Sequence, residues 1–185
     1  MSQLFLPPPG QLFASLLFNT KYIQRDQAIL LWTEKWGTGE SFSPEFNPMK
    51  DYYSTEMGPS TDLERVIIVS DKLYEREELL KAKLWSVKEE NLRGNTGRHI
   101  NIDPGLMTLE NIILGTGKIY GHRPYLGHGV YADLNLLYVS GSYTPLDWTY
   151  PDYKEKEVIS FFNHRRIKLH ESLKNEKLDS YNARR

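Results

Sequence analysis

The sequence contains no cysteine, so disulfides, thiolate metal sites and a cysteine nucleophile are excluded. It also lacks long hydrophobic runs. The longest apolar stretches, residues 12–18 and 66–69, are far shorter than the roughly 18–20 residues of a membrane-spanning helix. The N-terminus has neither the basic start nor the apolar core of a signal peptide. We therefore predict a cytoplasmic protein with no membrane partner.

An excess of charge of one sign is missing as well. Lys and Arg total 23 against 24 Asp and Glu, which leaves a net charge of -1. Attraction of the whole molecule to nucleic acid or anionic lipid is therefore not expected. The balance conceals an uneven distribution, because residues 51–90 hold ten acids and six bases, whereas residues 163–185 hold seven bases and three acids. The basic C-terminal segment is the one feature that points to nucleic acid.

The residues that are present suit one folded domain. The 185 residues are 39% hydrophobic and 12% aromatic, a composition typical of globular proteins. Pro7, Pro8 and Pro9 mark residues 1–10 as a proline-rich leader. We predict a single α+β domain over residues 11–178, divided into a core (11–105) and an extension (106–178), followed by a frayed basic tail at 179–185.

The core alternates strand and helix signals. The first signals predict a strand at 12–18, a helix at 22–36 that Gly37 ends, and an edge strand at 41–46. A loop at 47–61 and a strand at 63–70 follow. The last two elements are a helix at 76–92, with Leu80, Leu84 and Val87 on its buried face and Gly94 at its end, and a strand at 98–102. This βαββαβ order is typical of a ferredoxin-like sandwich, an antiparallel sheet with both helices on one face.

The extension predicts a hairpin and a helix. Its elements are a turn at Asp103-Pro104-Gly105, a short helix at 108–115 with Thr108 as its N-cap, a hairpin of strands 130–139 and 142–146, and a helix that begins in a capping box of Asp152 and Glu155 and buries Val158, Phe162, Leu169 and Leu173.

Motifs for cofactors and metals are missing. The Gly115–Lys118 segment lacks the first glycine of a phosphate-binding loop, because position 112 is Ile, and lacks the Ser or Thr after the lysine. His164 and His170 fall on different faces of a helix. The sequence predicts no metal site and leaves any cofactor open.

Three loop-like stretches collect polar and aromatic residues, and they also carry a family resemblance. They contain the words DYY and EMG within residues 51–58, NIDPG at 101–105, HR-x-YLG at 122–127, G-x-YA at 129–132 and WTYPDY at 148–153. On these words, in this order, the chain resembles the prokaryotic family called domain of unknown function 4416. The resemblance implies no activity, substrate or cofactor.

The same stretches supply the candidate site residues. Asp103 and His122 could exchange protons, while Arg123 and Lys118 could hold an anion. The other candidates are loop acids and tyrosines: Asp51, Tyr52, Glu56, Tyr125, Tyr150 and Asp152.

The same residues could instead have purely structural roles. Asp103 suits a turn, Arg123 could pair internally with Asp103 or Asp51, and His122 could cap a helix end. Asp51 and Glu56 could bind a hard metal or serve as hydrogen-bonded fasteners.

Two functions follow as hypotheses. The first is a small enzyme, or a nucleotide- or phosphometabolite-binding protein, in which Asp103, His122, Arg123 and one of Asp51 or Glu56 meet in one pocket. The alternative is a non-catalytic module that binds RNA or protein through Trp148, Tyr150, Tyr153 and the basic C-terminal helix. The sequence leaves the reaction, the ligand and the oligomeric state open.

Overall fold

The first strand of the fold, β1 (Gly10–Asn19), is an inner strand that is buried along its whole length in an antiparallel sheet. The computed structural model describes residues 4–45, 50–93 and 98–182. Predictions for residues 1–3, 46–49, 94–97 and 183–185, including the helix end at Gly94, lie outside the described residues. The sheet order is β2-β3-β1-β4-β5-β7-β6, and β8 pairs with β7.

The other elements follow β1 along the chain. They are α1 (Arg25–Trp36), β2 (Gly39–Phe42), α2 (Lys50–Met57), η1 (Ser60–Asp62), β3 (Leu63–Tyr74), α3 (Glu78–Leu92), β4 (Ile100–Met107), β5 (Asn111–Thr116), β6 (Tyr125–Gly127), β7 (Val130–Val139), β8 (Ser142–Pro145), η2 (Pro151–Lys154) and α4 (Lys156–Asn182).

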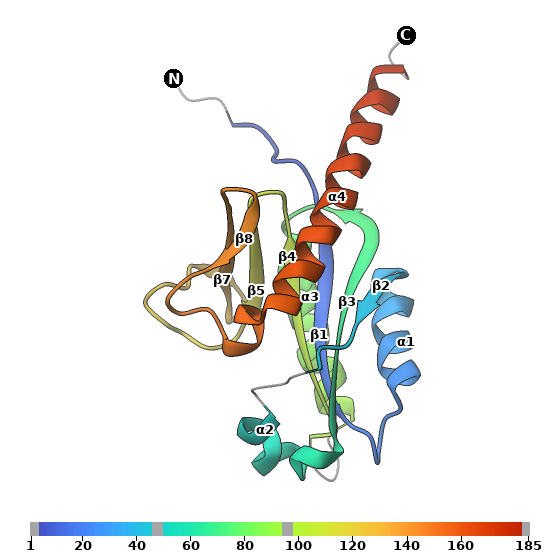
Figure 1. Cartoon of the computed structure of the whole chain (residues 1–185), viewed down its shortest axis with the longest axis vertical. Helices are drawn as coiled ribbons and strands as arrows, with labels where there is room; N and C mark the ends of the chain where they lie inside the picture. The colour runs from blue at the N-terminus through green and yellow to red at the C-terminus, as the bar shows by residue number, and fades with distance from the viewer. Residues whose placement is uncertain (1–3, 46–49, 94–97, 183–185) are drawn as a thin grey trace.

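Helices cover both faces of this sheet (Figure 1). Alternate residues of β1 point to opposite sides, so that Leu12 and Leu16 join the core under α1 and α3, whereas Phe13 joins the core under α4. The predicted α4 residues Val158, Phe162, Leu169 and Leu173 are all buried in that second core. The α+β class is therefore confirmed. The eight-stranded order as a whole differs from that of a four-stranded ferredoxin-like sandwich.

Several elements match the sequence predictions closely. The predicted strands at 12–18 and 63–70 lie within β1 and β3, and the predicted hairpin forms as β7 and β8. Gly37 ends α1 with a φ of 79°, and its N–H bonds to the carbonyl oxygen of Thr33 at 2.9 Å. A residue with a side chain is strained in this conformation, which explains the stop signal.

The turn predicted at Asp103-Pro104-Gly105 is wrong, because all three residues lie in β4 and pair with β1. The register of β4 with β5 covers Gly105–Met107, so Pro104 lies where β4 has β1 alone as its paired neighbour among the described residues. A strand tolerates proline at such a position. Gly105 provides space: a Cβ there would lie 2.1 Å from Cζ of Phe13.

The short helix predicted at 108–115 is also wrong. Thr108 lies in the tight turn between β4 and β5, and its Oγ1 accepts the N–H groups of Glu110 and Asn111 at 3.2 and 3.1 Å. The apolar residues that follow, Ile112 and Leu114, are buried on a sheet face. The β-branched side chain of Ile112 favours a strand, and the hydroxyl of Thr108 closes the turn that lets this strand follow β4.

Two further predictions need correction. Part of the loop predicted at 47–61 is helical, because it contains α2 and η1. The buried face of α3 consists of Leu79, Ala82, Lys83 and Ser86, whereas the predicted face residues Leu84 and Val87 are exposed. The helix is thus rotated relative to the prediction, and it buries a lysine.

Candidate functional site

A cavity of about 470 Å³ opens where β4 and β5 separate. The two strands pair over Gly105–Met107 and Ile112–Leu114, so the start of β4 and the end of β5 diverge on one side of this pairing. Side chains from α2, α3, β3 and η2 surround the opening. The lining includes six of the predicted site residues: Tyr52, Glu56, Asp103, Lys118, Tyr150 and Asp152.

Lys83 is a buried cation in the lining of this cavity. It extends from the buried face of α3, and only 9% of its surface is exposed. Its Nζ lies 3.7 Å from Oδ1 of Asp103, which is an ion pair but is beyond hydrogen-bond distance. A Cβ on Gly115 would lie 3.1 Å from Cβ of Lys83, so the glycine leaves room for the lysine stem to pass β5.

Asp103 faces Lys83 from β4. Its Oδ2 accepts a hydrogen bond from Nδ2 of Asn101 at 2.6 Å, and its side chain is one-third exposed. The carboxylate therefore has a fixed orientation and open surface toward the cavity. This arrangement lets it accept or donate a proton to a bound molecule.

Arg65 and Asp152 form a buried ion pair on the wall of the cavity. Arg65 also donates to Oγ of Ser15 at 3.0 Å. Burial raises the pKa of Asp152, and the neighbouring Arg65 guanidinium opposes that rise. The predicted capping role of Asp152 is wrong, because its carboxylate bonds to Arg65 and α4 begins only at Lys156.

Arg98 organises the other end of the cavity. Its Nη2 donates to Glu90 at 2.8 Å and its Nη1 to Glu56 at 3.2 Å. The second oxygen of Glu90 accepts the backbone N–H of Ile102 at 2.6 Å. Burial nevertheless raises the pKa of Glu90, with Arg98 acting in the opposite direction. Both carboxylates are bound by Arg98, whereas Asp103 has no arginine partner among the described residues and pairs with Lys83 only at 3.7 Å.

Tyrosines complete the lining. Burial raises the pKa of both Tyr53 and Tyr150, so the two phenols stay protonated at neutral pH. The hydroxyl of Tyr52 accepts from Nζ of Lys118 at 3.4 Å. No carboxylate of the described residues lies within 4.0 Å of Lys118, so its charge is available to a ligand.

His122 and Arg123 lie beside the cavity rather than in its lining. Both bind the buried carboxylate of Asp133, His122 through Nε2 at 3.1 Å and Arg123 through Nη2 at 2.9 Å. His122 also stacks on Trp148, with ring centres 4.6 Å apart. The internal pairing considered for Arg123 therefore occurs, but Asp133 replaces the expected Asp103 or Asp51. Arg123 still influences the cavity, because it donates to the hydroxyl of Tyr150 at 2.9 Å.

Asp51 and Tyr125 are the remaining predicted residues, and both lie outside the cavity lining. Asp51 is exposed in the first turn of α2. Tyr125 is exposed in β6, and its hydroxyl accepts the N–H of Gly129 at 3.2 Å. Among the described residues, no group of three or more His, Asp or Glu side chains could hold a metal ion.

The cavity includes residues that the sequence reasoning did not select. They are Tyr53, Arg65, Lys83, Glu90, Arg98 and Asn101. A usable signal existed for Lys83, since it falls at helical spacing with Leu79, Ala82 and Ser86. A lysine on such a face needs a partner or a ligand. No local pattern joins Arg65 to Asp152, which are 87 positions apart.

The cations of the C-terminal helix are also bound internally. Arg165 is only 1% exposed, and it pairs with Asp71 at 2.8 Å and with Glu40 at 3.2 Å. Lys168 pairs with Glu40, and Arg166 lies over the ring of Tyr138. These side chains fasten α4 to the sheet, which leaves little of their charge for a polyanion.

Comparison with known proteins gives one family. The family model described as "Domain of unknown function (DUF4416)" matches residues 8–168. The chain belongs to the DUF4416 family. The match spans every element from β1 to the first half of α4, so this DUF4416 protein has the whole cavity within the family region. No curated protein and no solved structure matches it. Within the described part of the chain, no helix combines the length and apolar character needed to cross a membrane.

Proposed function

We propose that this DUF4416 protein binds a small phosphorylated metabolite in the cavity between β4 and β5. The observation that carries the proposal is Lys83, a cation that is buried in a cavity and has no carboxylate within hydrogen-bond distance among the described residues. Burying an ammonium group without such a partner is costly, and a bound anion would offset that cost. Lys118 offers a second cation at the same cavity.

A phosphate group suits this pair of lysines. A phosphomonoester carries up to two negative charges at neutral pH, which matches two ammonium groups. Arg65 and Arg98 are already neutralised by Asp152 and Glu90, so they shape the cavity without adding free positive charge. The tyrosines and Asp103 supply hydrogen-bonding groups for the uncharged part of the ligand.

An enzymatic role is a narrower version of the same proposal. Asp103 would exchange a proton with the ligand, because it is oriented by Asn101 and partly open. His122 receives less support as a second proton carrier, since it is held against Asp133 and Trp148 outside the lining. Arg123 would act as a positioning residue through Tyr150.

The test is a thermal-shift screen with inorganic phosphate, pyrophosphate, sugar phosphates and nucleotides. A ligand at about one hundred times its dissociation constant should stabilise the wild type by about 2.7 kcal/mol. Lys83→Met should lose most of this stabilisation and Lys118→Met part of it. Lys88→Met is the matched control, because Lys88 is exposed on the same helix outside the cavity.

Asp103→Asn separates binding from proton exchange. It removes a negative charge close to Lys83, so anion binding should stay equal or become tighter. If no phosphorylated compound stabilises the wild type, or if Lys83→Met and Lys88→Met respond alike, the proposal is wrong.

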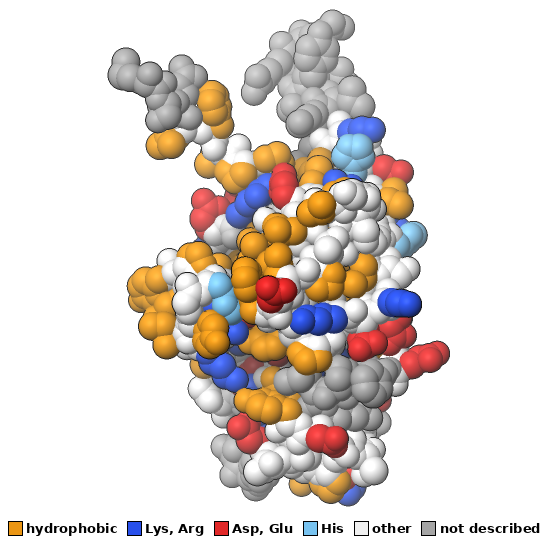
Figure 2. Space-filling model, turned by 60° about the vertical axis from the view of Figure 1, so that its left-hand side comes forward, with side chains coloured by type: hydrophobic (Ala, Val, Ile, Leu, Met, Phe, Trp, Pro, Cys, Tyr) orange, Lys and Arg blue, Asp and Glu red, His pale blue; other side chains and the backbone are white. Residues whose placement is uncertain are grey.

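The module that binds RNA through the C-terminal helix receives less support. Arg165 is buried in ion pairs, and Tyr153 is buried in the core. Figure 2 shows hydrophobic side chains gathered over the side that carries β7 and β8, with few cations among them. The exposed residues of the nearby segment include Ile119, Tyr120 and Tyr125.

We also propose that β2-β3-β1-β4 with α1 and α3 forms a ferredoxin-like unit to which the later strands were added. The strand order of this half and the placement of α1 and α3 in one core support it. A cytoplasmic location stays a prediction.

A further inference from the structure

A second recess lies along the groove between α1 and α3. It consists of two adjoining hollows of about 560 and 840 Å³. Glu34 lines the first hollow and Lys35 the second, while Leu92 lines the first and Lys88, one turn earlier on α3, lines the second. Both hollows are therefore lined by the same two helices, the first mainly by the N-terminal part of α1 and the second by its C-terminal end. We refer to them together as the α1–α3 groove.

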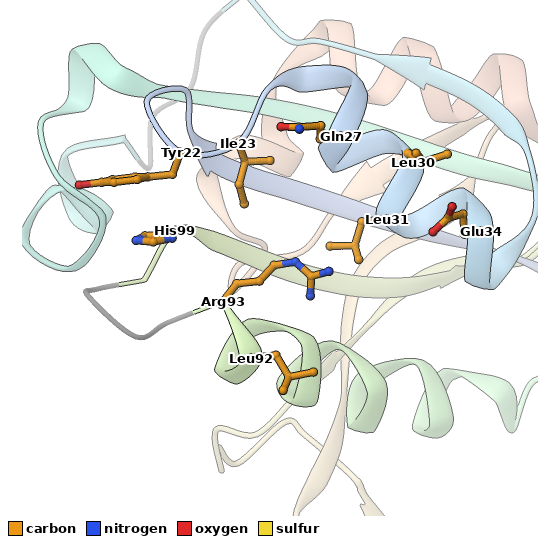
Figure 3. Close-up of a pocket in the computed structure, with 9 residues that line it drawn as sticks. All are labelled: Tyr22, Ile23, Gln27, Leu30, Leu31, Glu34, Leu92, Arg93 and His99. Atoms are coloured by element: carbon orange, nitrogen blue, oxygen red, sulfur yellow. The ribbon is translucent and has the colours of Figure 1, made fainter.

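One part of the groove surface is apolar. Figure 3 shows the first hollow, where Leu31 of α1 points toward Arg93 of α3, and where Leu30 and Leu92 also belong to the lining. Leu30 is 53% exposed and Leu92 is 61% exposed. In the second hollow Leu84 is exposed beside Trp85. Side chains of this size exposed together on one surface mark an interaction site more often than scattered ones do.

The other part of the groove is positively charged. Lys35, Lys72 and Lys88 line the second hollow, and no carboxylate of the described residues lies within 4.0 Å of any of them. Lys81 is different, because it pairs with Glu78. In the first hollow Arg93 pairs with Glu89. Two carboxylates of the groove, Glu34 in the first hollow and Glu75 in the second, likewise have no cation within 4.0 Å among the described residues. The unpaired charges are therefore three lysines against two glutamates, and all three lysines lie around the aromatic end.

The aromatic side chains of the groove offer edges rather than faces. Trp36 contacts Tyr74 and Trp85 in edge-to-face geometry, at 71° and 84° between ring planes. Nζ of Lys35 and Nζ of Lys72 lie over the rings of Trp36 and Tyr74. A nucleic-acid base needs an open ring face for stacking, and these faces are occupied. The groove therefore favours a peptide over a single-stranded nucleic acid.

A hydrogen-bond donor in the groove is also unsatisfied. Nε1 of Trp36 is buried and has no hydrogen-bond partner among the described residues. A buried indole N–H normally finds an acceptor.

From this combination we infer that the α1–α3 groove binds an acidic peptide segment of a partner protein. Acidic side chains of the segment pair with Lys35, Lys72 and Lys88, and its apolar side chains cover Leu30, Leu84 and Leu92. The 12 residues of α1 span about 18 Å, the length of about six extended residues. The inference is independent of the ligand proposed for the cavity, which involves other lysines.

The experiment uses fluorescence anisotropy with a labelled eight-residue peptide of alternating glutamate and leucine. Comparison probes are an alternating lysine–leucine peptide and an oligouridine. The full chain should bind the acidic peptide with an affinity that falls as salt rises, and it should bind neither comparison probe. Lys35→Glu/Lys72→Glu/Lys88→Glu should weaken binding at least about tenfold.

Two further variants complete the design. Lys154→Glu/Lys156→Glu/Lys174→Glu makes the same change in charge on η2 and α4, across the sheet, and should bind as the wild type does. Leu30→Ser/Leu92→Ser should weaken binding while the thermal midpoint stays close to that of the wild type, because both leucines are exposed. The inference is overturned if the acidic peptide does not bind, if oligouridine or the basic peptide binds as tightly, or if both triple variants have equal effects.

Discussion

Replacing Gly105 with alanine should destabilise the protein strongly. In β4 a Cβ at this position would lie 2.1 Å from Cζ of Phe13 and 2.8 Å from the carbonyl oxygen of Ile113. Phe13 is fully buried, and its ring packs edge-on against Phe162 at 5.0 Å, so it has no free space to move into. The methyl group must therefore displace backbone or a packed ring.

The expected magnitude comes from two opposing effects. Overpacking a buried site costs about 1–3 kcal/mol, and this site belongs at the upper end because one of the close contacts is with backbone. Alanine recovers about 0.5–1 kcal/mol by reducing the freedom of the unfolded chain. We expect a net loss of about 2–2.5 kcal/mol, measured as the fall in the urea midpoint at unchanged slope.

Gly117→Ala is the matched control, because the nearest neighbouring atom to its Cβ would be a carbonyl oxygen 4.0 Å away. Its stability should stay within about 0.5 kcal/mol of the wild type. Phe13→Leu in the Gly105→Ala background should recover part of the loss, since a smaller side chain relieves the clash. A Gly105→Ala protein that loses less than about 1 kcal/mol, or a double variant no better than additive, would refute this packing explanation.

Three other predictions concern buried and paired charges. Arg65→Met should lower the free energy of unfolding by about 3–5 kcal/mol, because it leaves the Asp152 carboxylate buried without its cation. Urea unfolding measures this loss, and a loss under about 1 kcal/mol would contradict the prediction. The hydrogen bond from Lys168 lowers the pKa of Glu40 below 4.5. The ionised Glu40 therefore stabilises the folded state above pH 4.5, and this stabilisation is lost as pH falls through the folded-state pKa. Unfolding curves recorded at a series of pH values should show a smaller loss of stability on the acid side for Glu40→Gln than for the wild type. Burial raises the pKa of Glu90 above 4.5, so the pH dependence of its contribution to stability has the opposite sign. The contribution is present below pH 4.5 and is lost as pH rises through the folded-state pKa. Glu90→Gln should remove this pH dependence, and equal profiles of stability against pH for Glu90→Gln and the wild type would refute the raised pKa.

Sequence patterns predicted those strands and helices that form because of residues within the same segment. The alternation in β7 and the apolar spacing in α4 needed no knowledge of neighbours, and both elements form where expected. Asp103-Pro104-Gly105 misled because the same residues suit a turn, while here the glycine fits under the ring of Phe13 from another strand. Thr108 misled in a similar way, since its hydroxyl holds a hairpin turn as readily as it caps a helix.

Only part of the candidate site was predicted, because local patterns do not show which segments meet in space. Asp103, Lys118 and Tyr150 were predicted because they are polar residues in stretches between apolar segments, where binding residues are common. Lys83 was missed because the buried face of α3 was predicted from Leu80, Leu84 and Val87. Leu84 is in fact exposed in the α1–α3 groove, and Val87 is exposed at the cavity. Which cations meet which acids depends on the sheet order, and that order brings together residues from both halves of the chain.

The short pairing between β4 and β5 has a consequence for local unfolding. Gly105–Met107 join β5 to the rest of the sheet, whereas β5 pairs with β7 from Asn111 to Thr116. The strands on either side of this seam can therefore separate at a lower free energy than either group needs to unfold by itself. Hydrogen exchange would reveal this as earlier exchange of amides in the seam than of those in β1, with β5, β7 and β8 behaving as one cooperative unit.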